Sequence, residues 1–111
     1  MTKKLRVLHR ETVAAMPTAD NQEIHVLFAR LEPGERTPCH SHRSPVTVYM
    51  LEGTFTLELE GRDAVAIKAG EVFVEPPQVR MTGRNLDPKT PATMALFYVS
   101  TPDTPFADAV V

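Results

Sequence analysis

The sequence predicts an all-β fold built from short antiparallel strands. Ten prolines and five glycines divide the 111 residues into short pieces. The stretches between them are rich in β-branched and aromatic residues, and none keeps a helical spacing of apolar residues over three turns. Short strands separated by frequent turn residues are typical of a β-sandwich or β-barrel. We therefore expect one all-β domain, either a sandwich or a barrel.

Six stretches carry the strand signal in order along the chain. They are EIHVLFARL (23–31), TVYML (47–51), TFTLELE (54–60), AVAIK (64–68), EVFVE (71–75) and ATMALFYVS (92–100). The clearest is TFTLELE, in which Phe55, Leu57 and Leu59 alternate with polar residues and so share one face of a strand. Residues 61–63, Gly-Arg-Asp, then predict a hairpin turn into AVAIK.

The first and last of these stretches, 23–31 and 92–100, are apolar on both faces. In an antiparallel fold such a strand needs cover on its second face. The N-terminal segment, residues 1–22, could supply that cover by packing on the barrel, and so could a second subunit. We favour a homodimer. The expected division of the chain is thus an N-terminal segment, a barrel over residues 23–100 and a C-terminal tail over 101–111.

Composition and charge exclude several partners and settings. Twelve basic and fourteen acidic residues give a net charge of −2, and no run of Lys or Arg creates a basic patch. We therefore expect neither nucleic acid nor a membrane as partner. The charged start lacks the apolar core of a signal peptide, and no stretch reaches transmembrane length. The one cysteine, Cys39, cannot form an internal disulfide. A cytoplasmic location is expected.

Two histidines one residue apart, His40 and His42, are the main candidate site residues. Side chains alternate along a strand, so both should project from the same face, about 6.6 Å apart along the strand. At that spacing two imidazoles can reach one metal ion or one polar ligand group. The same alternation sends Cys39 to the opposite face.

From Pro33 onward, over about two thirds of its length, the chain resembles the cupin family of small β-barrels. The first family motif is a glycine, H-x-H, a glutamate and a second glycine, and its spacing is matched by Gly34, His40, His42 and Gly53. The second motif is matched by Gly70, Pro76 and Asn85. The resemblance implies a cupin double-stranded β-helix, a jelly-roll-like antiparallel barrel with its ligand cavity between the motif strands.

The resemblance also implies a divalent metal held by three histidines and a glutamate, of which this sequence retains His40 and His42. Val46 stands at the glutamate position and Met81 at the last histidine position. A thioether sulfur suits Cu(I) better than a first-row divalent ion. His25 is a weaker candidate ligand, provided that its face of the first strand points inward. The expected cofactor is therefore a divalent metal ion (Zn, Ni, Fe or Mn) or Cu(I), and a metal-free protein is the remaining alternative.

Three functions remain open. The favoured one is binding of a small organic molecule, and one loosely held metal ion, in the barrel cavity. Its pocket would combine the two polar anchors with an apolar wall: His40, His42, Val46, Val48, Met50 and Met81. The second is a metal-dependent dioxygenase- or isomerase-like enzyme, with His25 or solvent completing the coordination. The third is a metal-free, epimerase-like enzyme with a histidine as general base, which needs an orienting carboxylate.

Overall fold

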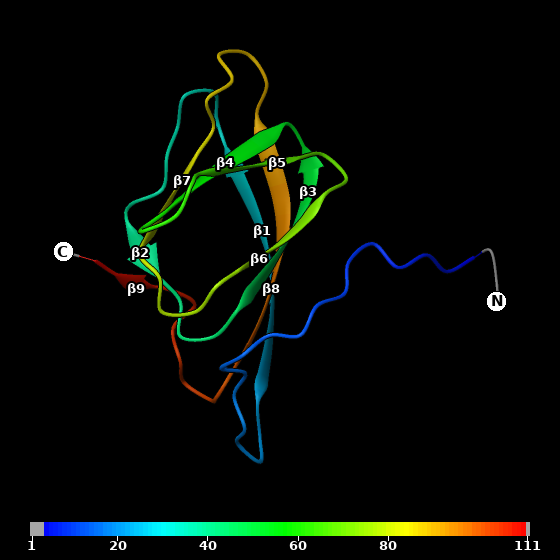
Figure 1. Cartoon of the computed structure of the whole chain (residues 1–111), viewed down its shortest axis with the longest axis vertical. Helices are drawn as coiled ribbons and strands as arrows, with labels where there is room; N and C mark the ends of the chain where they lie inside the picture. The colour runs from blue at the N-terminus through cyan, green and yellow to red at the C-terminus, as the bar shows by residue number, and fades with distance from the viewer. Residues whose placement is uncertain (1–3, 111) are drawn as a thin grey trace.

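A computed structural model describes residues 4–110 of the chain. These residues form nine strands and no helix, arranged as two antiparallel sheets (Figure 1). The predicted all-β fold is confirmed. No helix that could span a membrane occurs in this part of the chain.

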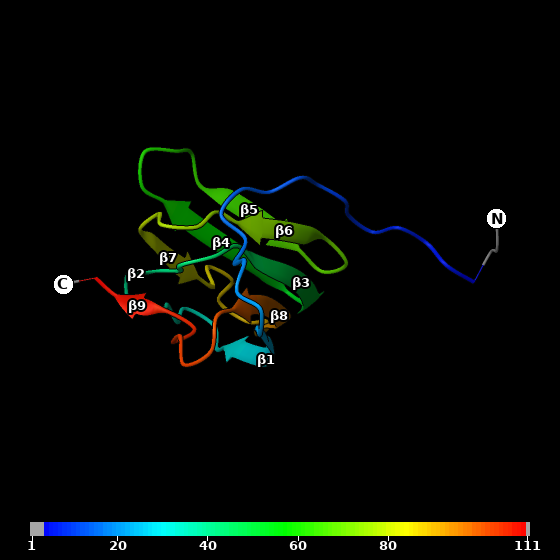
Figure 2. The ribbon, with the colours of Figure 1, turned by 90° about the horizontal axis from the view of Figure 1, so that it is seen from below.

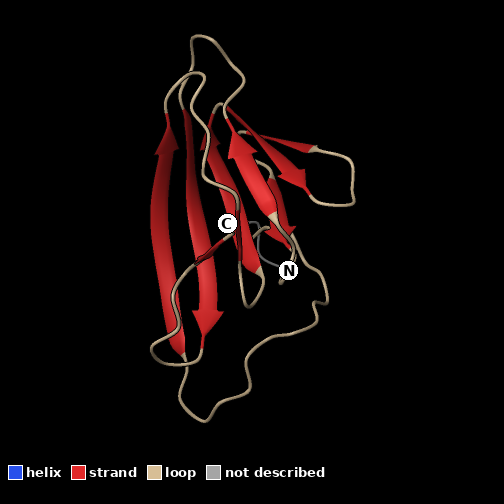
Figure 3. Ribbon diagram, turned by 90° about the vertical axis from the view of Figure 1, so that its left-hand side faces the viewer, coloured by secondary structure: helices blue, strands red, loops and turns tan. Residues whose placement is uncertain are grey.

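The two sheets are built from strands that are mostly not consecutive in sequence. The first sheet has the order β1 (Glu23–Leu31), β8 (Ala92–Ser100), β3 (Val46–Glu52) and β6 (Val72–Glu75). The second has the order β5 (Val65–Lys68), β4 (Thr54–Leu59), β7 (Met81–Arg84), β2 (His40–Ser41) and β9 (Asp108–Ala109). The chain passes repeatedly from one layer to the other, as Figures 2 and 3 show.

Apolar side chains from both layers meet between the sheets. Phe55, Leu57 and Leu59 of β4 are buried there, as their alternation predicts, against Val48 and Met50 of β3. Burial of each large apolar side chain contributes about 1.5–3 kcal/mol. The predicted hairpin is also confirmed, because β4 pairs antiparallel with β5. This core holds the two sheets together.

Residues 101–110 of the expected C-terminal tail fold back onto the barrel. β9 pairs with β2, in the register of His40 opposite Ala109. The ring of Phe106 lies 4.8 Å from that of His42 and 5.4 Å from that of Tyr98. The segment therefore belongs to the barrel, and it covers one side of the space beside β2.

The outward face of the first sheet remains partly open. On β1, the side chains of Ile24, Val26 and Phe28 are 78%, 66% and 66% exposed. Residues 4–22, here called the arm, contain no strand or helix, and their first part runs clear of the barrel (Figure 1). The arm does not cover β1, so the expectation of a homodimer stays a prediction.

Candidate functional site

A cavity of about 410 Å³ opens beside β2 and draws its lining from both sheets and from the C-terminal segment. Most of the wall is apolar, formed by Ala29, Leu31, Pro38, Phe55, Met94, Leu96, Phe106, Ala107 and Ala109. The polar lining residues are Thr37, Cys39, His40, His42 and Glu75. Polar groups are thus few and concentrated around the two histidines.

Both histidines are oriented by backbone carbonyls. His40 Nδ1 lies 2.8 Å from the carbonyl oxygen of Pro38, and His42 Nδ1 lies 2.7 Å from that of Phe106. Because a carbonyl can only accept a hydrogen bond, each Nδ1 carries a proton and donates it. The rings stand 4.9 Å apart on the same side of the chain, as the alternation predicts. Nε2 is therefore the ring atom that each histidine can offer to another group.

Glu75 is the site residue that sequence reasoning missed. Its Oε1 lies 3.2 Å from His42 Nε2, and the two side chains are 5% and 1% exposed. Glu75 of β6 pairs directly with Val46 of β3, and such cross-strand partners project on the same face. A carboxylate thus stands one strand away from the expected glutamate position. The sequence did contain a signal for Glu75. It stands two residues after Phe73 on the same strand, so both side chains project from the same, inward face.

The pKa of His42 is raised above its ordinary value. Burial by itself would lower this pKa, because it disfavours the charged ring. The hydrogen bonds to Glu75 and to the Phe106 carbonyl oppose that effect, as do the negative charges of Glu75 and Asp108, and together they outweigh it. Protonated His42 can donate from both ring nitrogens at once, to the carbonyl and to the carboxylate.

This raised pKa predicts a pH dependence of stability. A group whose pKa is higher in the folded state contributes stability that is fully present below its unfolded pKa, about 6.5 for histidine. That contribution is lost as the pH rises through the raised folded value. We expect the free energy of unfolding, measured in urea, to fall as the pH rises from about 6.5. Glu75→Gln should weaken this dependence of the free energy of unfolding on pH. If the dependence is equally steep in the variant, Glu75 is not the cause of the raised His42 pKa.

The predicted apolar wall lies in the core and not on the cavity lining. Val46, Val48 and Met50 are fully buried in β3, and Met81 of β7 is 1% exposed. β3 lies inside its sheet, so its inward side chains meet the facing sheet across the core. The cavity lies instead toward β1, β8 and the C-terminal segment. Cys39 is exposed, consistent with facing away from His40, yet it also contributes to the cavity lining.

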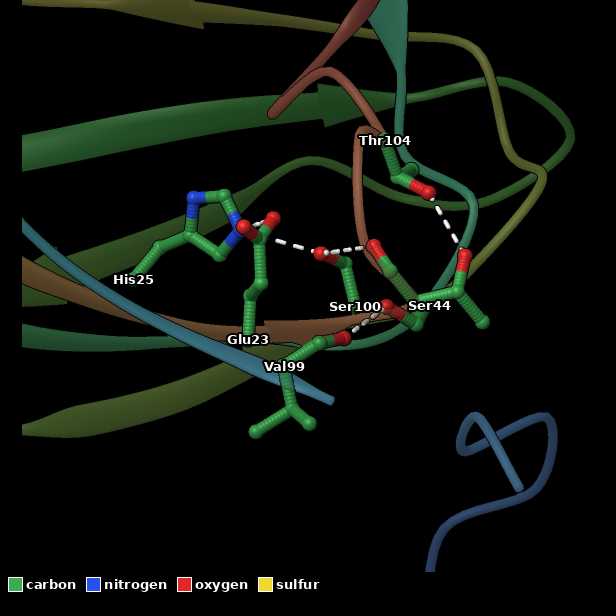
Figure 4. Close-up of polar contacts among 7 residues, drawn as sticks. Glu23, His25, Ser44, Val99, Ser100 and Thr104 are labelled. Atoms are coloured by element: carbon green, nitrogen blue, oxygen red, sulfur yellow. Dashed lines mark hydrogen bonds and ion pairs between the residues drawn. The ribbon is translucent and has the colours of Figure 1, made fainter. Parts of the chain in front are cut away.

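His25 lies on the inward face of β1 but outside the cavity lining. Its Nε2 is 2.9 Å from Ser100 Oγ and 3.7 Å from Glu23 Oε1 (Figure 4). Ala29 and Leu31, farther along the same face of β1, do line the cavity. The ring of Tyr98 lies between the two places, 5.3 Å from the ring of His25 and 6.1 Å from that of His42.

The donor atoms do not fit a resident metal. In residues 4–110, no group of three or more His, Cys, Asp or Glu side chains could hold a metal ion. The Nε2 atom of His42 faces Glu75, and His25 and Met81 lie elsewhere.

The fold and the motif positions match a known family model. Residues 27–99 match the cupin domain model. The chain belongs to the cupin family. No match to this cupin was found among curated proteins.

Solved structures share the fold of this cupin. A cupin-like protein from Thermotoga maritima is 26% identical with a TM-score of 0.66, over 78% of this chain and 64% of that one. A conserved protein with a double-stranded β-helix domain from Klebsiella pneumoniae is 18% identical with a TM-score of 0.64, over 87% and 91%. The polyketide cyclase RemF from Streptomyces resistomycificus is 23% identical with a TM-score of 0.61, over 79% and 61%. The chain thus spans less than two thirds of two of these proteins.

Proposed function

We propose that this cupin binds a small, mostly apolar organic molecule in the cavity beside β2. The observation that carries the proposal is the combination of a largely apolar wall with His40, His42 and Glu75. At about 410 Å³ the cavity lies within the range of small-molecule sites. The single cysteine agrees with the cytoplasmic setting expected from the sequence.

The polar anchor of the ligand follows from the hydrogen bonds of the two histidines. His40 donates through Nδ1 to Pro38, so in the neutral ring Nε2 is an acceptor. His42 Nε2 is directed at Glu75. A ligand with one O–H or N–H donor, such as a phenolic hydroxyl, would satisfy His40 Nε2 while its apolar body fills the cavity. A fully charged ligand would lose its hydration to an apolar wall.

Calorimetric titration with phenol and 2-naphthol tests this proposal. We expect saturable binding that His40→Ala weakens by about three- to tenfold, the loss expected for one hydrogen bond. The exposed His9 provides the matched control, and His9→Ala should leave the affinity unchanged. Ala29→Trp, which fills the cavity, should abolish binding. Unchanged affinity in both His40→Ala and Ala29→Trp would overturn the proposal.

A metal-free enzyme is the second candidate, favoured by the buried His42–Glu75 pair. A carboxylate that orients a histidine is the element which a histidine general base requires. Both ring nitrogens of His42 already have partners, Phe106 and Glu75. In this candidate the base is therefore His40 through its Nε2, with the His42–Glu75 pair beside it in the cavity. Incubation of the protein with a ligand in deuterated water separates the two candidates. Proton transfer would exchange a carbon-bound hydrogen of the ligand for deuterium, which raises the mass of the recovered ligand. Simple binding would leave that mass unchanged.

A further inference from the structure

We propose that a second, smaller cavity of this chain binds a small carboxylate anion through the hydroxyl of Tyr98 and the guanidinium of Arg43. This Tyr98 cavity has a volume of about 170 Å³ and lies at the end of β8, beside the loop that follows the strand. Among residues 4–110, none lines both the Tyr98 cavity and the cavity beside β2. The inference is therefore independent of the proposed ligand of the larger cavity.

The hydroxyl of Tyr98 is a buried polar group without a partner. Tyr98 is 1% exposed, and its hydroxyl oxygen is the one buried side-chain nitrogen or oxygen in residues 4–110 that forms no hydrogen bond within the chain. A buried hydroxyl without a partner carries its full desolvation cost, and native proteins contain few such groups. Because Tyr98 lines the smaller cavity, a group bound there can satisfy this hydroxyl.

The two serines that line the Tyr98 cavity already donate their protons within the fold. Ser44 Oγ donates to the carbonyl oxygen of Val99 at 2.6 Å, and Ser100 Oγ donates to that of Thr101 at 2.8 Å (Figure 4). A hydroxyl has only one proton to donate, so neither serine can also donate to a ligand or to Tyr98. The proton of the Tyr98 hydroxyl remains available for an acceptor.

Arg43 gives the Tyr98 cavity its charge. In the part of the chain that the structure describes, it is the only charged residue of the lining. Its Nε and Nη2 atoms donate to the two carboxylate oxygens of Asp108, at 3.0 and 3.1 Å, which uses two of the five N–H donors of a guanidinium. The pKa of Arg43 is raised, first by the hydrogen bond to Asp108 and, in smaller part, by Tyr98, so the phenol lies within the electrostatic reach of the guanidinium.

The remaining hydroxyls of the lining add a further donor. Thr101 Oγ1 and Thr104 Oγ1 lie 2.7 Å apart, so one of them donates to the other and the acceptor keeps its own proton for a ligand. Unused donors and a positive charge together favour an anion as the occupant of the cavity. A carboxylate also matches the planar fork of a guanidinium.

Charge and size narrow the class of anion. Because Asp108 already offsets part of the charge of Arg43, a singly charged carboxylate fits the Tyr98 cavity better than a doubly charged phosphate. At about 30 Å³ for each water molecule, the volume corresponds to about five waters. That space admits a short carboxylate such as formate or acetate and excludes a large one.

Titration of the Tyr49→Phe variant with sodium formate tests the proposal. The chain contains two tyrosines and no tryptophan, so in this variant Tyr98 dominates the near-ultraviolet absorbance. We expect formate to produce a saturable change in that absorbance, and sodium chloride at equal ionic strength to produce none. Adding His40→Ala should leave the formate titration unchanged, because His40 lines the other cavity. An equal response to both salts would show a general effect of salt and overturn the proposal.

Arg43→Met in the same background removes the charge of the Tyr98 cavity and keeps an apolar side chain. We expect the dissociation constant for formate to rise at least about tenfold, as the loss of a charge-assisted hydrogen bond implies. The exposed Arg62, in the turn between β4 and β5, provides the matched control Arg62→Met, which should bind formate as the Tyr49→Phe variant does. Equal affinity in Arg43→Met and Arg62→Met would contradict the assigned role of Arg43 and overturn the proposal.

Tyr98→Phe separates a ligand-binding role of the hydroxyl from a structural one. Without formate, this variant should be at least as stable to heat as the parent chain, because it deletes a buried hydroxyl that has no partner. With formate, the melting temperature of the parent should rise and that of the variant should rise less, since a ligand stabilises the form that binds it. A variant less stable than the parent by the same amount with and without formate would show that the hydroxyl serves only the fold, and would overturn the proposal. A formate titration of Tyr49→Phe without a saturable change would overturn it equally.

Discussion

Glu75→Ala is expected to destabilise the fold by about 3–5 kcal/mol, because it removes one partner of a buried pair and leaves the other uncompensated. His42 and Glu75 are 1% and 5% exposed and 3.2 Å apart, so the carboxylate that is lost is the buried partner of His42. The measurement is the free energy of unfolding from urea titrations near pH 6, where His42 is protonated. We expect a much lower urea concentration at the midpoint of unfolding, and an unchanged dependence of the free energy of unfolding on urea concentration.

The matched control is Glu58→Ala. Glu58 also forms an ion pair, with its Oε1 2.9 Å from Arg84 Nε, but its side chain is 50% exposed. Exposed pairs contribute about 0–1 kcal/mol, so this variant should remain close to the parent. The double variant Glu75→Ala/His42→Ala should lose less stability than the sum of the single variants. If the loss of stability in the double variant equals the sum of the two single losses, His42 and Glu75 do not stabilise the fold as a pair.

Gly53→Ala is the second large effect that we expect. Gly53 has a φ of +74°, in the left-handed region, where an L-residue costs about 1–2 kcal/mol. A Cβ at this position would also lie 2.3 Å from the carbonyl oxygen of Pro91, which is backbone and cannot rotate away. Adding about 1–3 kcal/mol for overpacking gives a total loss of about 2–5 kcal/mol. Thermal and urea unfolding measure this loss.

Gly61→Ala separates the two causes. Gly61 has nearly the same φ, +76°, but apart from its own chain neighbours no atom lies within 4 Å of the place where its Cβ would stand. This variant should lose only the conformational part, about 1–2 kcal/mol. The difference between the two variants then measures the collision with Pro91. Equal losses would show that the backbone near Pro91 yields without cost.

Local pattern was sufficient to predict the hairpin of β4 and β5 and six of the strands, but it did not predict β7 or β9. The alternation of Phe55, Leu57 and Leu59 identified the inward face of β4, because side chains of a strand alternate regardless of what the strand packs against. The spacing of His40 and His42 likewise placed both rings on one side. Such inferences depend on residues a few positions apart, and the backbone geometry between them is nearly constant.

The composition of the candidate site was only half predictable. The two histidines were found from their spacing, but the apolar wall was assigned to β3, whose inward residues belong to the core. Glu75 was missed because its proximity to His42 depends on which strands are neighbours and in which register. Phe106 was missed for the same reason, since the hydrogen bond from His42 to its carbonyl joins residues 64 positions apart.

By itself, the sequence determined the all-β class, the turn positions and the pair of histidines on one face. These features follow from alternation and turn chemistry, which act between residues close together along the chain. Only the tertiary structure decided that Glu75 meets His42, that the C-terminal segment lines the cavity, and that the outward face of β1 stays open. Those contacts depend on sheet order and register, which the packing of the whole core selects.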